Sequence, residues 1–322
     1  LSITFFSCDS EPKENLPDVK WSLERADKAM VNAQSVEELQ AYFSEHQRFG
    51  KLGMGLGLRP EGDGPFYKSM MRLANDPKID SLYEKCENVY GEDLNELEQE
   101  FDEAFSRLKS YYTDFQPPNV YTVVTGLGYD LMLRDSLLIV GLDYYLGNEH
   151  FPVAPPDPYG VPLPKYIWQR YEPATIVPHS MLFLVNRYAE KDPADRRLIN
   201  EMITWGKILY LAQKVMPEKS PHLLIGYTEQ QWVDTEASAA QVYRFFVEQQ
   251  LFFEAGREAK TKYIQERPFT GELSGRAPGR LGVWLGWKIV EAYMEKNPET
   301  SIQDLMAMQD AQKIFEESRY RP

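Results

Sequence analysis

The sequence is poor in cysteine. Its 322 residues contain two, Cys8 and Cys86, which lie far apart in the chain. Small secreted domains that depend on disulfides carry many more, so a disulfide scaffold is excluded. The chain does not need one, because 43% of its residues are hydrophobic and a chain of this length buries a large apolar core.

Long apolar runs and positive charge are also scarce. The longest apolar stretch, residues 136–142, is far shorter than the roughly 18–20 residues that a membrane-spanning helix needs. Lys and Arg number 35 against 49 Asp and Glu, which gives a formal net charge of −14. An acidic surface repels phosphate backbones and anionic headgroups, so we expect a soluble body that binds no nucleic acid.

Familiar catalytic motifs are missing. The sequence has no G-x-S-x-G elbow, and Cys86 has no neighbouring His to activate it. Its glycine-rich segment at 275–282 follows no strand, which excludes a dinucleotide fingerprint. No two of the four histidines are within five residues of each other; they are His46, His150, His179 and His222. We therefore expect no catalytic residues, no metal and no cofactor.

The N-terminus is typical of a bacterial lipoprotein. An apolar stretch over residues 1–7 ends in the small residue Ser7, and Cys8 follows. The positively charged start of such a signal is missing, so the given chain would begin inside the hydrophobic region. We predict a signal-peptide tail and lipobox over 1–8, with lipid on Cys8, and a Pro-rich charged tether over 9–18. The alternative is a buried first strand with Cys8 as an inert thiol.

The rest of the chain, residues 19–322, reads as one α+β domain that is predominantly helical. Residues 19–116 show helical periodicity, with a long helix from 92 to 115. Residues 120–125 and 137–142 read as strands of a small sheet around residues 119–143, with a turn-like stretch at 126–135. A loop rich in Pro and Gly at 147–165 is typical of a segment that borders a cleft. Further helices are expected at 177–190, 195–216, 236–254, 257–265, 279–296 and 301–317.

Several segments together resemble the family of gliding-motility lipoproteins known as GldB. They are GLDYYLG at 141–147, IGYTEQQW at 225–232, PFT at 268–270, PGRLGVWLGWKIV at 278–290 and SRYRP at 318–322. With the lipobox they extend over the whole chain, weakly over 19–116. The resemblance implies a role in gliding motility and the linked protein-secretion machinery.

That family is similar in layout to zinc metallopeptidases, in which a helix with H-E-x-x-H places two His one turn apart on the metal. The equivalent helix here reads PHSMLF at 178–183. His179 would be the first ligand, while Ser180 replaces the general base and Phe183 the second ligand. Glu201 on the next helix is a former third ligand. The resemblance thus implies a zincin-like domain that has lost its metal.

We therefore expect a non-enzymatic lipoprotein that binds a protein partner through the former peptidase cleft or the segments 226–236 and 278–290. It would be anchored in the envelope through Cys8 alone, most simply in the outer membrane facing the periplasm. The candidate contacts are Trp232, Arg276, Arg280, Trp284 and Trp287.

Three alternatives stay open. The protein could be a hydrolase that acts without the usual zinc site. Arg276 and Arg280 could pair with an internal carboxylate instead of facing a partner. Gly282 and Gly286, which lie four residues apart on one helix face, could pack in the core or form an interface with a partner; core packing is favoured.

Overall fold

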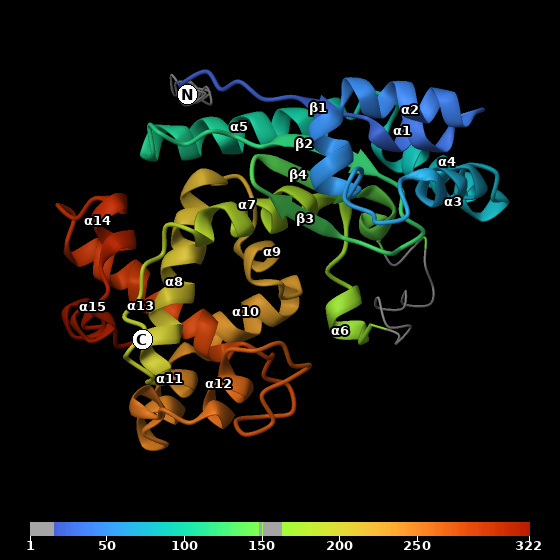
Figure 1. Cartoon of the computed structure of the whole chain (residues 1–322). Helices are drawn as coiled ribbons and strands as arrows, with labels where there is room; N and C mark the ends of the chain where they lie inside the picture. Colours follow the sequence, from blue (N-terminus) through green and yellow to red (C-terminus); the bar gives the residue numbers. More distant parts are fainter. Residues whose placement is uncertain (1–15, 148–149, 151–162) are drawn as a thin grey trace, which may run out of the picture.

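The computed structural model describes residues 16–147, 150 and 163–322 (Figure 1). Helices dominate, and a small sheet lies among the first half of them. The helices are α1 (Ala26–Val31), α2 (Val36–Glu45), α3 (Gly64–Ala74), α4 (Pro77–Tyr90), α5 (Asn95–Tyr111), α6 (Lys165–Trp168), α7 (Ile176–Asn186), α8 (Leu198–Val215), α9 (Pro221–Ile225), α10 (Glu229–Ala237), α11 (Ala239–Glu248), α12 (Arg257–Tyr263), α13 (Leu281–Lys296), α14 (Ile302–Ala307) and α15 (Ala311–Ser318).

The sheet has four strands in the order β1-β2-β4-β3. Strands β1 (Leu23–Glu24), β2 (Asn119–Val123) and β4 (Leu137–Gly141) run parallel, and β3 (Leu131–Arg134) is an antiparallel edge strand beside β4. Alternate residues of the central strands face opposite sides. One set, including Val120 and Leu138, belongs to the main helical core, while Tyr121 and Ile139 pack under α1 and α2.

The buried carboxylate of Asp143, just after β4, holds the loop that follows β2. Asp143 is fully buried and its Oδ2 accepts the amide N–H groups of Thr125 and Leu127, at 3.1 and 2.7 Å. Burial raises the pKa of Asp143 to about 6, although these backbone hydrogen bonds act in the opposite direction. Asp143 is thus a buried carboxylate that caps this loop. The loop then continues into β3.

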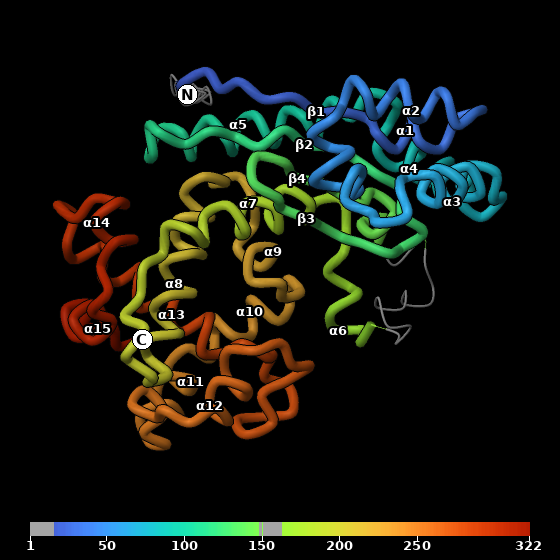
Figure 2. The backbone as a smooth tube through the Cα atoms, in the orientation of Figure 1, coloured from blue at the N-terminus to red at the C-terminus, as the bar shows by residue number. Residues whose placement is uncertain are grey.

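Helices α8 and α13 form the centre of the C-terminal half (Figure 2). Their backbones meet at two glycines: a Cβ added at Gly286 would lie 1.9 Å from the carbonyl oxygen of Met202, and one at Gly206 would lie 2.3 Å from that of Gly286. A Cβ at Gly282 would lie 2.8 Å from the carbonyl oxygen of Tyr263. The prediction that Gly282 and Gly286 serve core packing is confirmed.

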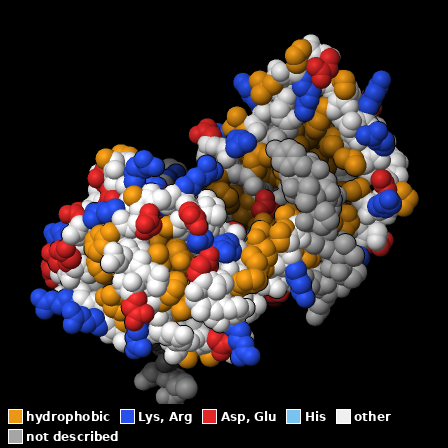
Figure 3. Space-filling model, turned by 90° about the horizontal axis from the view of Figure 1, so that it is seen from below, with side chains coloured by type: hydrophobic (Ala, Val, Ile, Leu, Met, Phe, Trp, Pro, Cys, Tyr) orange, Lys and Arg blue, Asp and Glu red, His pale blue; other side chains and the backbone are white. Residues whose placement is uncertain are grey.

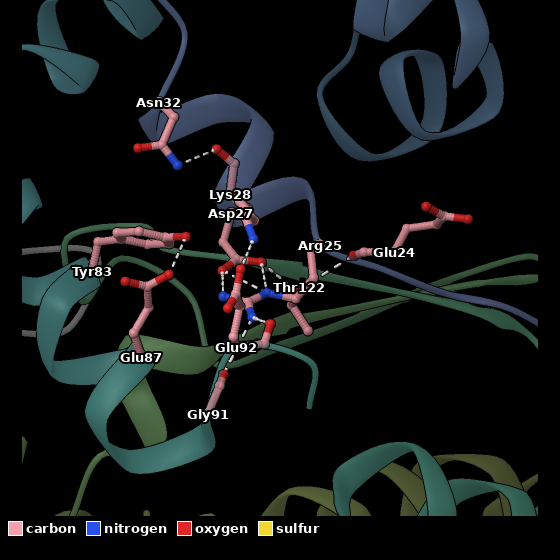
Figure 4. Close-up of polar contacts among 10 residues, drawn as sticks. All are labelled: Glu24, Arg25, Asp27, Lys28, Asn32, Tyr83, Glu87, Gly91, Glu92 and Thr122. Carbon is pink, nitrogen blue, oxygen red and sulfur yellow. Dashed lines mark hydrogen bonds and ion pairs between the residues drawn. The ribbon is translucent and has the colours of Figure 1, made fainter. Parts of the chain in front are cut away.

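A polar network fastens β1 and α1 to the sheet (Figure 4). The Arg25 guanidinium donates from Nε to both carboxylate oxygens of Asp27 at 3.0 Å, and Asp27 is fully buried. Asp27 also accepts the hydroxyl of Thr122 on β2 at 2.5 Å. Arg25 donates further to the carbonyl oxygen of Glu92, between α4 and α5. One ion pair therefore joins four segments of the N-terminal half.

The predicted class, α+β and mostly helical, is confirmed, and three details of the prediction are wrong. The stretch 126–135 contains the edge strand β3. The helix expected over 236–254 is α11, which spans only Ala239–Glu248, and α10 ends just before it at Ala237. The single helix expected over 301–317 is two helices, α14 and α15, separated by residues 308–310. The first strand, β1, was not predicted. Within the described residues, no helix is long and apolar enough to span a membrane. Residues 1–8, most of the tether and much of the loop 147–165 lie outside that part.

Candidate functional site

A cavity of about 360 Å³ opens between the half of the molecule that contains the sheet and the half that is built on α8 and α13. We call it the cleft. Figure 3 looks into a hollow there, lined with hydrophobic side chains and rimmed by charged ones. Edge strand β3, helix α7 and the segments around α6 and α9 contribute to its walls. Its lining residues are Asp130, Leu131, Tyr145, Ile167, Arg170, Tyr171, His179, Leu182, Phe183, Asn186, Trp205, Leu224, Gly226, Glu266 and Arg280.

Helix α7 presents His179 and Phe183, one turn apart, to the cleft. The Nδ1 atom of His179 lies 3.2 Å from the hydroxyl of Tyr145. Phe183 keeps 56% of its surface exposed. Ser180 is fully buried, does not line the cleft, and its hydroxyl donates to the Ile176 carbonyl oxygen at 2.8 Å. Two of the three positions predicted on this helix thus meet in one cleft.

Glu201 takes no part in the cleft. It forms ion pairs with Lys191 at 3.2 Å and Lys260 at 3.0 Å. Although burial opposes it, these two ammonium groups hold the pKa of Glu201 below its ordinary value. In the described part of the chain, no three His, Cys, Asp or Glu side chains are grouped so that they could hold a metal ion. Glu201 therefore does not join His179 in a former ligand set.

His179 is neutral at physiological pH. Its burial lowers its pKa to about 4; the Asp130 carboxylate opposes this shift, and the guanidinium groups of Arg170 and Arg280 add to it. Tyr145 is deeply buried beside it, which raises the pKa of that phenol well above its usual range. Nε2 of His179 has no hydrogen-bond partner among the described residues. The cleft therefore contains an uncharged imidazole with one nitrogen available.

Two arginines and one glutamate form a charged wall. Nη1 of Arg170 donates to Glu266 at 2.6 Å, and Nη1 of Arg280 lies 3.3 Å from the other oxygen of Glu266. Arg280 also donates to the Ile225 carbonyl oxygen at 2.8 Å, and its guanidinium lies over the Trp205 ring at 5.1 Å. Only 8% of Arg280 is exposed.

Arg280 therefore does not face a partner on the outer surface. Arg280 pairs with a carboxylate of its own chain, as the open alternative required, but that carboxylate, Glu266, is exposed and not internal; Arg276 is exposed as well. Arg280 is the residue before α13 and has a left-handed φ of 59°.

Trp284 and Trp287 were predicted as surface contacts, and this is wrong. Both are buried, at 0% and 1% exposure, because α13 is enclosed by neighbouring helices. The indole N–H of Trp284 donates to Glu236 at 2.8 Å. Trp232 is half-buried against Trp287, with ring centres 5.5 Å apart. Cys86 is buried as expected of a single thiol.

The residues that sequence reasoning missed come from scattered segments. Tyr145 lies in the segment GLDYYLG at 141–147, but nothing in the sequence indicated that its side chain would line a cleft. Asp130 accepts the hydroxyl of Tyr171 at 2.8 Å. Asp130, Arg170 and Glu266 are far apart in sequence and carry no local motif, so no signal was available to join them.

Comparison with known proteins gives one family. The model of the family described as gliding motility protein GldB matches residues 7–322. No curated protein and no solved structure matches the chain.

Proposed function

Because this chain belongs to the family of the gliding motility protein GldB, we propose that it is a non-enzymatic lipoprotein whose cleft holds a protein partner. The family carries a role in gliding motility and fits a lipid-anchored protein of the cell envelope. We also propose that the protein is attached through Cys8, that it lies in the outer membrane facing the periplasm, and that its partner belongs to the motility and linked secretion machinery. The domain would descend from a metal-dependent peptidase.

One observation carries the proposal. Phe183 lines the cleft one turn after His179, and more than half of its surface is exposed. A large aromatic side chain left in contact with water loses the free energy that burial would provide. Such a side chain in a concave site is typical of an anchor for a partner.

The test replaces Phe183 by Asp in cells. We expect Phe183→Asp to abolish gliding, measured as colony spreading and single-cell speed, while the lipoprotein stays folded and in the membrane fraction. Phe253 offers a matched control, since it is also 56% exposed but lies outside the cleft. Phe253→Asp should glide normally. If the two variants behave alike, the cleft is not the functional surface.

Metal content tests the non-enzymatic part of the proposal. Protein purified without chelator should contain well below one zinc per chain by elemental analysis, because Ser180 and Phe183 provide neither base nor ligand. If the wild-type protein contains one zinc per chain and His179→Ala contains none, the protein has a zinc site at His179. The non-enzymatic proposal would then be wrong, and a zinc peptidase would be the better interpretation.

A second candidate, a metal-independent hydrolase, is favoured by the neutral imidazole of His179 beside Arg280 in the same cleft. Such a group could act as a general base on water. The variant His179→Gln separates the two functions. A hydrolase would lose motility while partner binding persists, whereas under our proposal His179→Gln cells glide.

A further inference from the structure

The Arg280 guanidinium has hydrogen-bond donors that the protein does not use. A guanidinium carries five N–H groups. Nη1 is engaged by the Ile225 carbonyl and by Glu266. Nε and Nη2 have no partner among the residues that the structure describes, and Arg280 lines the cleft. These two nitrogens are not among the partnerless side-chain atoms that are sealed from solvent, so they are accessible from the cleft. They can donate to an anion there, and hydrogen bonds between charged groups are stronger than those between neutral ones.

Neither carboxylate of the cleft uses the free N–H groups of Arg280. Arg170 and Arg280 share the carboxylate of Glu266, which Arg280 reaches through Nη1 alone. Asp130, the second carboxylate of the lining, balances the remaining charge of the two guanidinium groups, but its hydrogen bonds come from the Tyr171 hydroxyl at 2.8 Å and the Leu131 amide at 2.7 Å. A carboxylate matches the planar fork of a guanidinium.

The rest of the cleft suits an apolar group attached to that anion. Leu182, Phe183 and Leu224 line it together with Arg280. Leu131 belongs to β3, whose outer edge is unpaired in the sheet of the described residues. An unpaired edge can hydrogen-bond to an extended backbone. The three features together match the end of a polypeptide: a carboxylate, an apolar side chain and an extended main chain.

We propose that the cleft captures the C-terminal carboxylate of a partner polypeptide that ends in a large apolar residue. The carboxylate binds Arg280, and the last side chain packs on Phe183. This inference rests on the proposed partner-binding function and specifies its ligand. A small-molecule carboxylate would satisfy Arg280 alone, but it would leave the edge of β3 and the exposed ring of Phe183 unused.

The experiment compares labelled octapeptides that differ only at the C-terminus. The full-chain protein is titrated with fluorescein-labelled peptides ending in Phe, Leu, Gly or Glu, each as the free acid and as the amide, and anisotropy is read. We expect free acids ending in Phe or Leu to bind, and amidation to weaken them about 10- to 100-fold, as expected for hydrogen bonds to a charged group. Equal affinity of acid and amide, or no binding of any peptide, overturns the inference.

Two variants locate the contact. Arg280→Gln should lower the affinity of the free acid to that of the amide, whereas the exposed neighbour Arg276→Gln should change nothing. Should Arg280→Gln unfold, the acid–amide comparison on the wild-type protein still decides the matter. Phe183→Ala should weaken peptides ending in Phe but keep the acid–amide ratio of the remaining binding.

A small probe distinguishes the other source of a carboxylate. If hydrocinnamate binds in an Arg280-dependent way while no peptide does, the cleft is a small-molecule site and the inference fails. The proposed function fails separately, when Phe183→Asp cells glide as well as Phe253→Asp cells.

Discussion

The contact between α8 and α13 makes a graded prediction about stability. In Gly286→Ala, the new Cβ would lie 1.9 Å from the Met202 carbonyl oxygen, and real Cβ contacts are essentially never below 3.0 Å. The two helices must therefore separate by more than 1 Å along their central contact. The atoms that the new Cβ would meet belong to the backbone of Met202. A change of side-chain rotamer therefore cannot remove the overlap.

The expected magnitude follows from three contributions. Alanine favours a helix over glycine by about 1 kcal/mol. Overpacking costs about 1–3 kcal/mol or more, and a gap of about 0.5–1 Å forfeits a quarter to a half of the dispersion attraction between facing atoms. We expect Gly286→Ala to lower the free energy of unfolding by about 2–4 kcal/mol. Gly282→Ala, whose Cβ would lie 2.8 Å from the Tyr263 oxygen, should lose less.

Chemical denaturation followed by circular dichroism checks this order. Gly64→Ala is the control, because Gly64 begins α3 and has nothing within 4 Å of an added Cβ. The midpoint should fall most for Gly286→Ala, less for Gly282→Ala, and stay or rise for Gly64→Ala, with unchanged m-values. A Gly286→Ala protein as stable as Gly64→Ala would refute the close backbone contact.

Three further predictions concern other parts of the chain. Lys207→Met should lower the free energy of unfolding by about 3 kcal/mol in the same assay, because the buried ammonium donates to the backbone carbonyls of Glu190, Met306 and Met308. The Met306 carbonyl would keep the Glu190 N–H, whereas the other two would be left unpaired among the described residues. His179 has a folded pKa of about 4, below its unfolded value of about 6.5. Its contribution to stability is therefore present above pH 6.5 and lost as pH falls toward 4; thermal unfolding of His179→Gln should show a shallower acid loss, and a parallel loss would contradict the assignment. Cys8→Ser should abolish fatty-acid labelling of the precursor and release it from membranes, and a mutant that still labels would exclude the lipobox.

Elements with a strong local signal were predictable from sequence. The apolar periodicity of 279–296 predicted α13, observed at Leu281–Lys296, and the β-branched run predicted β2 closely. The burial of Trp284 and Trp287 was not predictable, because a helix that is apolar on every side gives no indication of which faces meet other helices. Strand β3 was missed for a related reason: it is a short edge strand in which no residue is fully buried.

The cleft was predictable only in part. The spacing of His179 and Phe183 on one helix face followed from helical geometry, and their common exposure to the cleft is as expected. Arg170 and Arg280 reach Glu266 through tertiary packing across 96 and 14 positions of chain respectively, a relation that no local pattern encodes.

The network around Arg25 also has a mechanical consequence. If Cys8 carries the lipid, a pull between membrane and domain enters the described fold through residues 16–22. There, the Trp21 ring lies edge-on to Phe105 at 5.2 Å, and its N–H donates to Asp102 on α5 at 3.0 Å. Strand β1 has only two residues and would yield early under shear. The Arg25–Asp27 pair directly follows it and is hydrogen-bonded to β2 and to the α4–α5 junction (Figure 4), so we expect it to resist separation of the three segments. If the tether is under tension, we therefore expect the network around Arg25 to resist unfolding of the domain from its N-terminal end.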